Sequence, residues 1–420
     1  MTKAAVNRTV LDNGIRVLTK HMPYVRSVSM GVWVDVGARD ESPSENGLSH
    51  LIEHMIFKGT RRRSAYDIAK EFDAIGGHTN AFTSFETTCY HAKVMDARLD
   101  SMVDILSDIF LNSVFDPTEI ERERPVILQE IGMSEDNPED YLQTLAGRAV
   151  WGDTPLGRSI LGTRENVSGF TSQDVRHFFK RLYQPERILI SAAGNLDHQR
   201  IVDLVRDGFE KIGPGNGFPE RTVPPIRSVT GIYQRDLEQE HLCINTPGIA
   251  ISDPRRFAFS VLNTILGGNM SSRLFQEIRE RRGLAYSVYS FASSYMDSGL
   301  FGLYAGVSPE NTELTLNLMH QQLDRLQAKP VGDDELADAK EFIKGNLLLA
   351  AESNDNQMVR LAQNEINFGK YIPVSDVVAQ IDAVQTADVQ TLANDLFGDQ
   401  RYSLTLLGPL KELGPDFKGL

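Results

Sequence analysis

Residues 171–196 read TSQDVRHFFKRLYQPERILISAAGNL, and residues 386–410 read TADVQTLANDLFGDQRYSLTLLGPL. Three pairs of identical residues keep the same separation of 214 positions: Asp174 and Asp388, Arg187 and Arg401, Gly194 and Gly408. Repetition at a fixed distance indicates a duplicated structural unit. Each copy mixes strand-like and helix-like segments without regular alternation, so we predict an α+β fold with two related domains of about 210 residues.

A segment rich in glycine and proline separates the two copies. Residues 213–225 read GPGNGFPERTVPP and contain few apolar side chains, which is typical of a linker. We therefore predict a first domain over residues 1–212, a linker over 213–228 and a second domain over 229–420. The length of 420 residues exceeds what one hydrophobic core usually supports and agrees with two domains.

The composition is that of an ordinary globular protein, with 41% hydrophobic and 24% charged residues. The formal net charge of −14 argues against nucleic acid as a partner, and no apolar run is long enough to span a membrane. The opening residues, MTKAAVNRTVLDNG, lack the apolar core of a secretory signal, and the chain has only two cysteines. Together these features predict a cytoplasmic protein.

Local patterns assign regular elements to the first domain. Apolar residues alternate over residues 28–36, which predicts a half-buried strand. A helix is expected over residues 47–57. The dipeptide Asp-Pro at 116–117 opens another helix that continues to about residue 133, with Pro125 inside it.

The sequence HLIEH, residues 50–54, lies in the first of these helices. Residues four apart share one face of a helix, so the imidazoles of His50 and His54 can bind one metal ion, and histidine nitrogen suits zinc. Glu53 lies on nearly the same face and can reach a metal-activated water as a general base. The alternative is an amphipathic helix in which two histidines are placed by chance.

A catalytic zinc site needs a third protein ligand, for which Glu130 is the best candidate. Glu123 lies seven residues before it, which is about two helical turns, so both carboxylates face one side of the second helix. One carboxylate can bind the metal while the other supports the site by hydrogen bonding. The alternative is a pair of solvent-exposed glutamates. In the second copy of the repeat, Ala339 and Asn346 stand opposite Glu123 and Glu130, which suggests that the function belongs to one half only.

The chain resembles the pitrilysin family of metallopeptidases, and within it the β subunit of mitochondrial processing peptidase and short bacterial relatives. Three segments carry the resemblance: HLIEHMIFKGT at 50–60, ERERPVILQE at 121–130 and IRERRGLAYSVYS at 278–290. The resemblance implies a zinc endopeptidase with one Zn²⁺ per chain. It also implies a fold of mostly antiparallel sheets with packed helices.

Residue roles follow from the same resemblance. It implies that His50, His54 and Glu130 bind the metal, with Glu53 as the general base and Glu123 in support. Glu130 follows His54 by 76 residues, which is the spacing of the family's third ligand. Pro125 is not part of the family pattern, and it puts the role of Glu123 in question more than that of Glu130.

The resemblance also implies a substrate-binding set. Arg279 and Tyr286, seven residues apart in the second half, match a pair that holds the substrate in the family. Asn80, Ala81 and Phe82 match an edge strand that pairs with the extended peptide, and such main-chain pairing permits broad specificity. If the resemblance is set aside, Arg279 and Tyr286 are a structural arginine at a helix end and a structural tyrosine in a strand. The strand that contains residues 80–82 is then equally well an internal strand.

Long members of the family are single chains of four related domains that form a clamshell around the substrate. This chain would supply half of a clamshell, so the resemblance implies a homodimer that encloses short or unfolded peptides. A heterodimer with an inactive partner stays open, as does the physiological substrate. Two alternatives to an enzyme are a non-catalytic partner or core subunit of the same family, and a binding module with structural zinc. The intact set of His50, Glu53, His54 and Glu130 favours the enzyme.

Overall fold

The computed structural model describes residues 6–214, 217–218, 220–399 and 402–414. Gly215, Asn216 and Pro219 of the expected linker, and Arg401 of the repeat, lie outside these ranges. The chain divides into two compact units that are discontinuous in sequence. Unit 1 comprises residues 1–132, 159–221 and 349–371, and unit 2 comprises residues 133–158, 222–348 and 372–420.

Unit 1 is built on a six-stranded sheet with the order β1-β2-β6-β3-β5-β4. Its strands are β1 (Val6–Val10), β2 (Arg16–His21), β3 (Ser27–Val34), β4 (His78–Thr83), β5 (Thr88–Met95) and β6 (Ile188–Gly194). β2 and β6 run parallel, and the other neighbours are antiparallel. β4 therefore forms one edge of the sheet.

Unit 2 repeats this topology in a five-stranded sheet with the order β7-β11-β8-β10-β9. Its strands are β7 (Thr230–Gln234), β8 (Glu240–Pro247), β9 (Ala285–Ser294), β10 (Gly299–Val307) and β11 (Ser403–Gly408). β7 and β11 are parallel and the other pairs antiparallel, so the sheet matches β2-β6-β3-β5-β4 of unit 1 strand for strand. The predicted α+β class, with two related and mostly antiparallel sheets, is confirmed.

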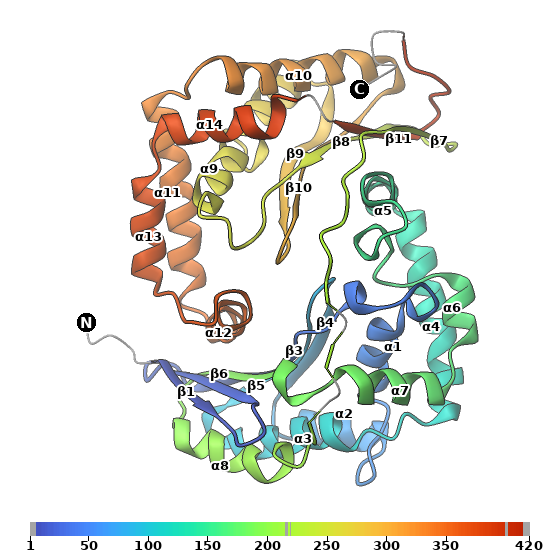
Figure 1. The fold of residues 1–420 in the computed structure, drawn as a ribbon, viewed down its shortest axis with the longest axis vertical. Coiled ribbons are helices and arrows are strands. Elements are labelled where there is room, and N and C mark those ends of the chain that lie inside the picture. Colours follow the sequence, from blue (N-terminus) through green and yellow to red (C-terminus); the bar gives the residue numbers. More distant parts are fainter. Residues whose placement is uncertain (1–5, 215–216, 219, 400–401, 415–420) are drawn as a thin grey trace. The chain divides into compact units, whose positions relative to one another are not determined.

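Helices cover both sheets (Figure 1). In chain order they are α1 (Leu48–Met55), α2 (Ala65–Ala74), α3 (Leu99–Asn112), α4 (Pro117–Asp136), α5 (Pro138–Trp151), α6 (Arg164–Gly169), α7 (Ser172–Leu182), α8 (His198–Phe209), α9 (Arg256–Gly267), α10 (Thr312–Ala328), α11 (Asp333–Ala350), α12 (Asn354–Phe368), α13 (Val374–Ala383) and α14 (Thr386–Phe397). Phe275–Glu280 forms a π-helical segment, η6. None of the described helices is both long and apolar enough to cross a membrane.

The two halves of the sequence exchange a helix. α12, from the second copy of the repeat, packs on β2, β3 and β6 of unit 1, and α5, from the first copy, packs on β8 and β11 of unit 2 (Figure 1). The chain also passes from unit 1 to unit 2 between Arg221 and Thr222, inside the expected linker. The glycine and proline pattern indicated that passage, but nothing in the pattern indicated the two exchanged segments.

The prediction of a half-buried strand over residues 28–36 is wrong in one respect, because β3 is buried on both faces. α12 covers the second face, where Met358, Leu361 and Ala362 join Trp33 in a buried cluster. The fit is close at Gly31, since a Cβ added there would lie 2.8 Å from the Sδ atom of Met358. The small residues at alternate positions of β3 thus make room for a helix.

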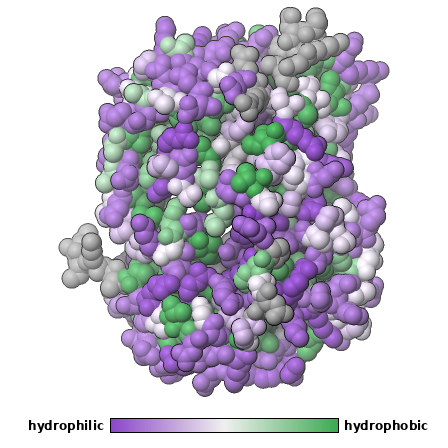
Figure 2. Space-filling model, in the orientation of Figure 1, coloured by the Kyte–Doolittle hydropathy of each residue, from purple (hydrophilic) through white to green (hydrophobic). Residues whose placement is uncertain are grey.

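Hydrophilic residues predominate on the face of the molecule shown in Figure 2, and hydrophobic residues appear there in separate groups.

Candidate metal centre

The helix that carries HLIEH begins after a glycine with left-handed backbone. Gly47 has a φ of 106°, and a Cβ added to it would lie 3.0 Å from the Cα atom of Gly162. The buried carboxylate of Glu41 accepts hydrogen bonds from the backbone N–H groups of Gly47 (2.9 Å) and Ser49 (2.7 Å), and from Asn46 Nδ2 (3.1 Å). Glu41 thus satisfies N–H groups at the first turn of α1, directly before His50.

Glu41 was not identified from the sequence, because it lies outside the helix and follows no periodic pattern. Burial raises the pKa of its carboxyl group to about 7, although hydrogen bonds from Ser49, Gly47 and Asn46 oppose this rise. A buried acid with three donors around it is a fixed part of the local fold.

The three expected ligands lie close together in unit 1. The Oε2 atom of Glu130 lies 3.5 Å from His50 Nε2 and 3.4 Å from His54 Nε2. Ligand atoms about 2.1 Å from a tetrahedral zinc ion are about 3.4 Å apart, so this spacing fits such an ion. Within the described residues, His50, His54 and Glu130 form the one group of three such side chains that could hold a metal.

The protonation of His50 suits a ligand. Burial, with a smaller effect of the neighbouring His54, lowers the pKa of His50 to about 4. The imidazole is therefore neutral near pH 7 and has a lone pair for a metal. The Nδ1 atom of His50 is buried without a hydrogen-bond partner among the described residues.

Glu123 orients the second histidine. Its Oε1 atom lies 2.9 Å from His54 Nδ1, and its Oε2 atom lies 2.5 Å from Lys58 Nζ. Burial alone would raise the pKa of Glu123, but Lys58 and His54 lower it below its ordinary value. A carboxylate that accepts a hydrogen bond from Nδ1 leaves Nε2 free to bind a metal.

Helix α4 continues through Pro125, and both Glu123 and Glu130 reach the histidines of α1. Lys58 was not identified from the sequence. It lies three residues beyond Met55, the last residue of α1, so no helical spacing indicated it.

Glu53 lies on α1 between the two histidines and faces the end of the edge strand. Burial raises the pKa of Glu53, although hydrogen bonding to Thr83 and the charge of His54 act in the opposite direction. Thr83 is the last residue of β4, and α1 contacts β4. The arrangement brings a partly desolvated carboxyl group beside the end of this strand.

β4 carries Asn80, Ala81 and Phe82 and has one strand neighbour, β5, among the described residues. It is thus an edge strand, the alternative that the resemblance favoured over an internal one. The ring of Phe82 packs edge-on against Trp33 at a centroid distance of 5.4 Å, so this side chain belongs to the second face of the sheet. Any contact of Phe82 with a peptide in β pairing would therefore come from its backbone.

Arg279 and Tyr286 lie in unit 2, on η6 and on the edge strand β9. Arg279 Nη1 donates to the backbone oxygen of Tyr286 at 2.7 Å, and the guanidinium carbon lies 4.5 Å from the centre of the Tyr286 ring. Tyr286 is 79% exposed. The structure thus brings the two residues together and leaves the tyrosine accessible.

Family models match both halves of the chain. Residues 16–164 match "Insulinase (Peptidase family M16)", and residues 169–343 match "Peptidase M16 inactive domain". An uncharacterized zinc protease of Streptomyces coelicolor is 42% identical, with 97% of this chain and 90% of the relative covered. An uncharacterized zinc protease of Bacillus subtilis is 39% identical, with 96% and 98% covered.

Solved structures share the fold. A protease from Helicobacter pylori superposes with a TM-score of 0.90 over 97% of this chain and 100% of that one, at 22% identity. A protein from Pseudomonas fluorescens, described as a peptidase M16 inactive domain, gives a TM-score of 0.89 at 20% identity, with 98% and 100% covered.

We expect Glu41→Gln to lower the free energy of unfolding by about 1–3 kcal/mol. Both carboxylate oxygens of Glu41 accept hydrogen bonds, whereas an amide has one accepting oxygen, so the substitution leaves a buried N–H group unpaired. Urea unfolding of the metal-free protein measures this change. Glu165→Gln, the same substitution at an exposed position of α6, is the matched control. Equal unfolding midpoints for the two variants would show that Glu41 does not hold the start of α1.

Proposed function

This chain belongs to peptidase family M16, as its resemblance to pitrilysin implied, and on that premise we propose that it is a zinc-dependent endopeptidase. The observation that carries the proposal is the convergence of His50 Nε2, His54 Nε2 and Glu130 Oε2 in unit 1. Zn²⁺ held by these atoms would act as a Lewis acid that lowers the pKa of a bound water and polarises a peptide carbonyl. The names of the relatives, both zinc proteases, support the choice of metal.

We assign the proton transfers to Glu53. Its carboxylate accepts a proton from the attacking water as the new C–O bond forms, and returns that proton to the leaving amine nitrogen as the C–N bond breaks. The raised pKa of Glu53 supports this role, because a higher pKa makes its carboxylate a stronger base toward the attacking water. Glu123 keeps His54 in the tautomer that binds metal, and Lys58 keeps Glu123 in place.

We assign substrate binding in unit 1 to the open edge of β4. An extended peptide that adds to this edge would form main-chain hydrogen bonds with Asn80, Ala81 and Phe82, which permits many side chains and requires an unfolded segment. The contact between α1 and β4 supports this assignment, since it brings the strand to the helix that carries Glu53. Short or unfolded peptides are therefore the proposed substrates.

We propose that the working assembly is a homodimer in which Arg279 and Tyr286 of one chain bind the peptide at the metal site of its partner. The chain has two of the four domains of the long family members, and C₂ dimers are the commonest closed assemblies. The exposure of Tyr286 supports a role in binding. Two such chains would enclose a chamber that excludes folded proteins.

Glu53→Gln should retain zinc and lose turnover by about 10²-fold or more, because the amide cannot accept the proton. Cleavage of an internally quenched peptide with both ends blocked measures endopeptidase activity, and elemental analysis measures zinc. Glu165→Gln is the matched control. Near-normal turnover in Glu53→Gln would remove this residue from the mechanism.

Mixing Glu53→Gln chains with Tyr286→Phe chains tests the dimer. Each parent should be strongly impaired, whereas a mixed dimer contains one site with wild-type zinc chemistry and a wild-type Tyr286, so activity should return. Subunit exchange is followed separately with two fluorescent labels. Exchange without recovery of activity would show that Tyr286 does not act across a dimer.

A further inference from the structure

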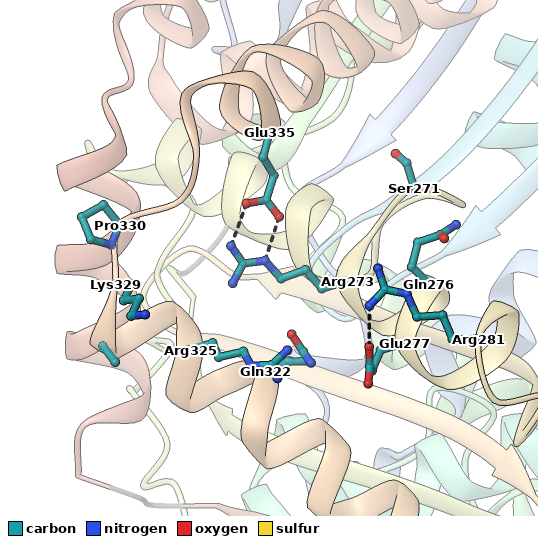
Figure 3. Close-up of a pocket in the computed structure, with 11 residues that line it drawn as sticks. Ser271, Arg273, Gln276, Glu277, Arg281, Gln322, Arg325, Lys329, Pro330 and Glu335 are labelled. Carbon is teal, nitrogen blue, oxygen red and sulfur yellow. Dashed lines mark hydrogen bonds and ion pairs between the residues drawn. The ribbon is translucent and has the colours of Figure 1, made fainter.

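A pocket of about 510 Å³ lies within unit 2, beside the segment η6 that also carries Arg279 (Figure 3). Side chains from η6, from the last turns of α10 and from the start of α11 line it. Four of the lining residues are basic, Arg273, Arg281, Arg325 and Lys329, and two are acidic, Glu277 and Glu335. The lining therefore has an excess of positive charge in a chain whose formal net charge is −14.

Both acidic residues are already paired with arginines. Arg273 donates from Nε and Nη2 to the two oxygens of Glu335, each at 2.7 Å, and Arg281 Nη1 donates to Glu277 at 2.9 Å (Figure 3). Arg282 adds a further ion pair to Glu277 at 2.8 Å. These pairs fix the walls of the pocket and neutralise its carboxylates.

Arg325 and Lys329 have no such partner. Neither side chain forms a hydrogen bond or ion pair with any residue that the structure describes. Arg325 lies in the last turn of α10, and Lys329 directly follows the last residue of that helix, so both cations line the pocket near the end of α10.

A buried amide lies beside these cations. Gln322 is 3% exposed, lines the pocket, and forms no side-chain hydrogen bond with a described residue. Its amide is therefore available to donate a hydrogen bond to a bound ligand.

We propose that the pocket binds a small phosphate-bearing molecule. Arg325 and Lys329 provide positive charge, and Gln322 provides a neutral N–H donor, which together suit the oxygens of a phosphate group. The volume exceeds the needs of a lone phosphate, and none of the described lining residues is aromatic, so the remainder of the ligand is polar rather than a stacked base. A hydroxyl-rich phosphate fits this polar lining.

Isothermal titration of the zinc-loaded protein with inorganic phosphate and with glucose 6-phosphate tests the proposal. We expect saturable binding of at least one probe, and about tenfold or greater weakening in the double variant Arg325→Gln with Lys329→Gln. The matched control is Lys70→Gln with Arg98→Gln, which removes the same charge from exposed positions in unit 1 and should leave binding unchanged. The tighter-binding probe distinguishes free phosphate from a phosphorylated metabolite.

Gln322→Leu provides a second test that folding does not confound. This substitution keeps the size of the side chain and removes the unpaired amide, so it should weaken binding without lowering the midpoint of urea unfolding. The proposal is overturned if neither probe shows saturable binding. It is also overturned if the affinity is unchanged in the double variant, which would assign binding to another site such as the metal centre. Finally, it is overturned if the Lys70→Gln with Arg98→Gln control loses as much affinity as the double variant.

Discussion

The exchange of α5 and α12 between the halves of the sequence is the constraint on which both sheets depend. An antiparallel sheet commonly leaves one face in water, but here α12 buries the second face around Trp33, and α5 does the same around Tyr304. β4 is one of the two edge strands of the unit 1 sheet, with β1 at the other edge, so one side of its backbone has no strand partner among the described residues.

The chemistry of the centre is divided between two helices of unit 1. α1 provides both histidines and Glu53 within about one turn. α4 provides Glu130, the candidate third ligand, and Glu123, the acid that contacts His54 Nδ1. The duplicated scaffold of unit 2 has the same strand order, but Ala339 and Asn346 occupy the places that correspond to the acids of α4. Within the described residues, the candidate metal ligands therefore lie in one copy of the fold.

Much of this could be predicted from the sequence, because the information was local or periodic. The HLIEH spacing and the two glutamates seven residues apart indicated the side chains that the structure brings together, and the fixed repeat distance indicated the duplicated α+β fold. The rest depends on tertiary contacts that have no local pattern. Glu41 reaches α1 from a loop, and the second face of β3 is covered by a helix more than 300 residues away in the sequence. Alternation alone reports one buried face, so the exchanged helices could not be inferred from it.

The central claim is that Glu130 completes a zinc site with the two histidines, and zinc content after Glu130→Gln tests it most directly. Chelator competition would give the stoichiometry and affinity for the wild-type protein, for this variant and for Glu165→Gln. The account predicts one zinc per chain in the wild-type protein and in the control, and a loss of affinity of about 10²-fold or more when the third ligand is removed. Unchanged stoichiometry and affinity in Glu130→Gln would contradict it.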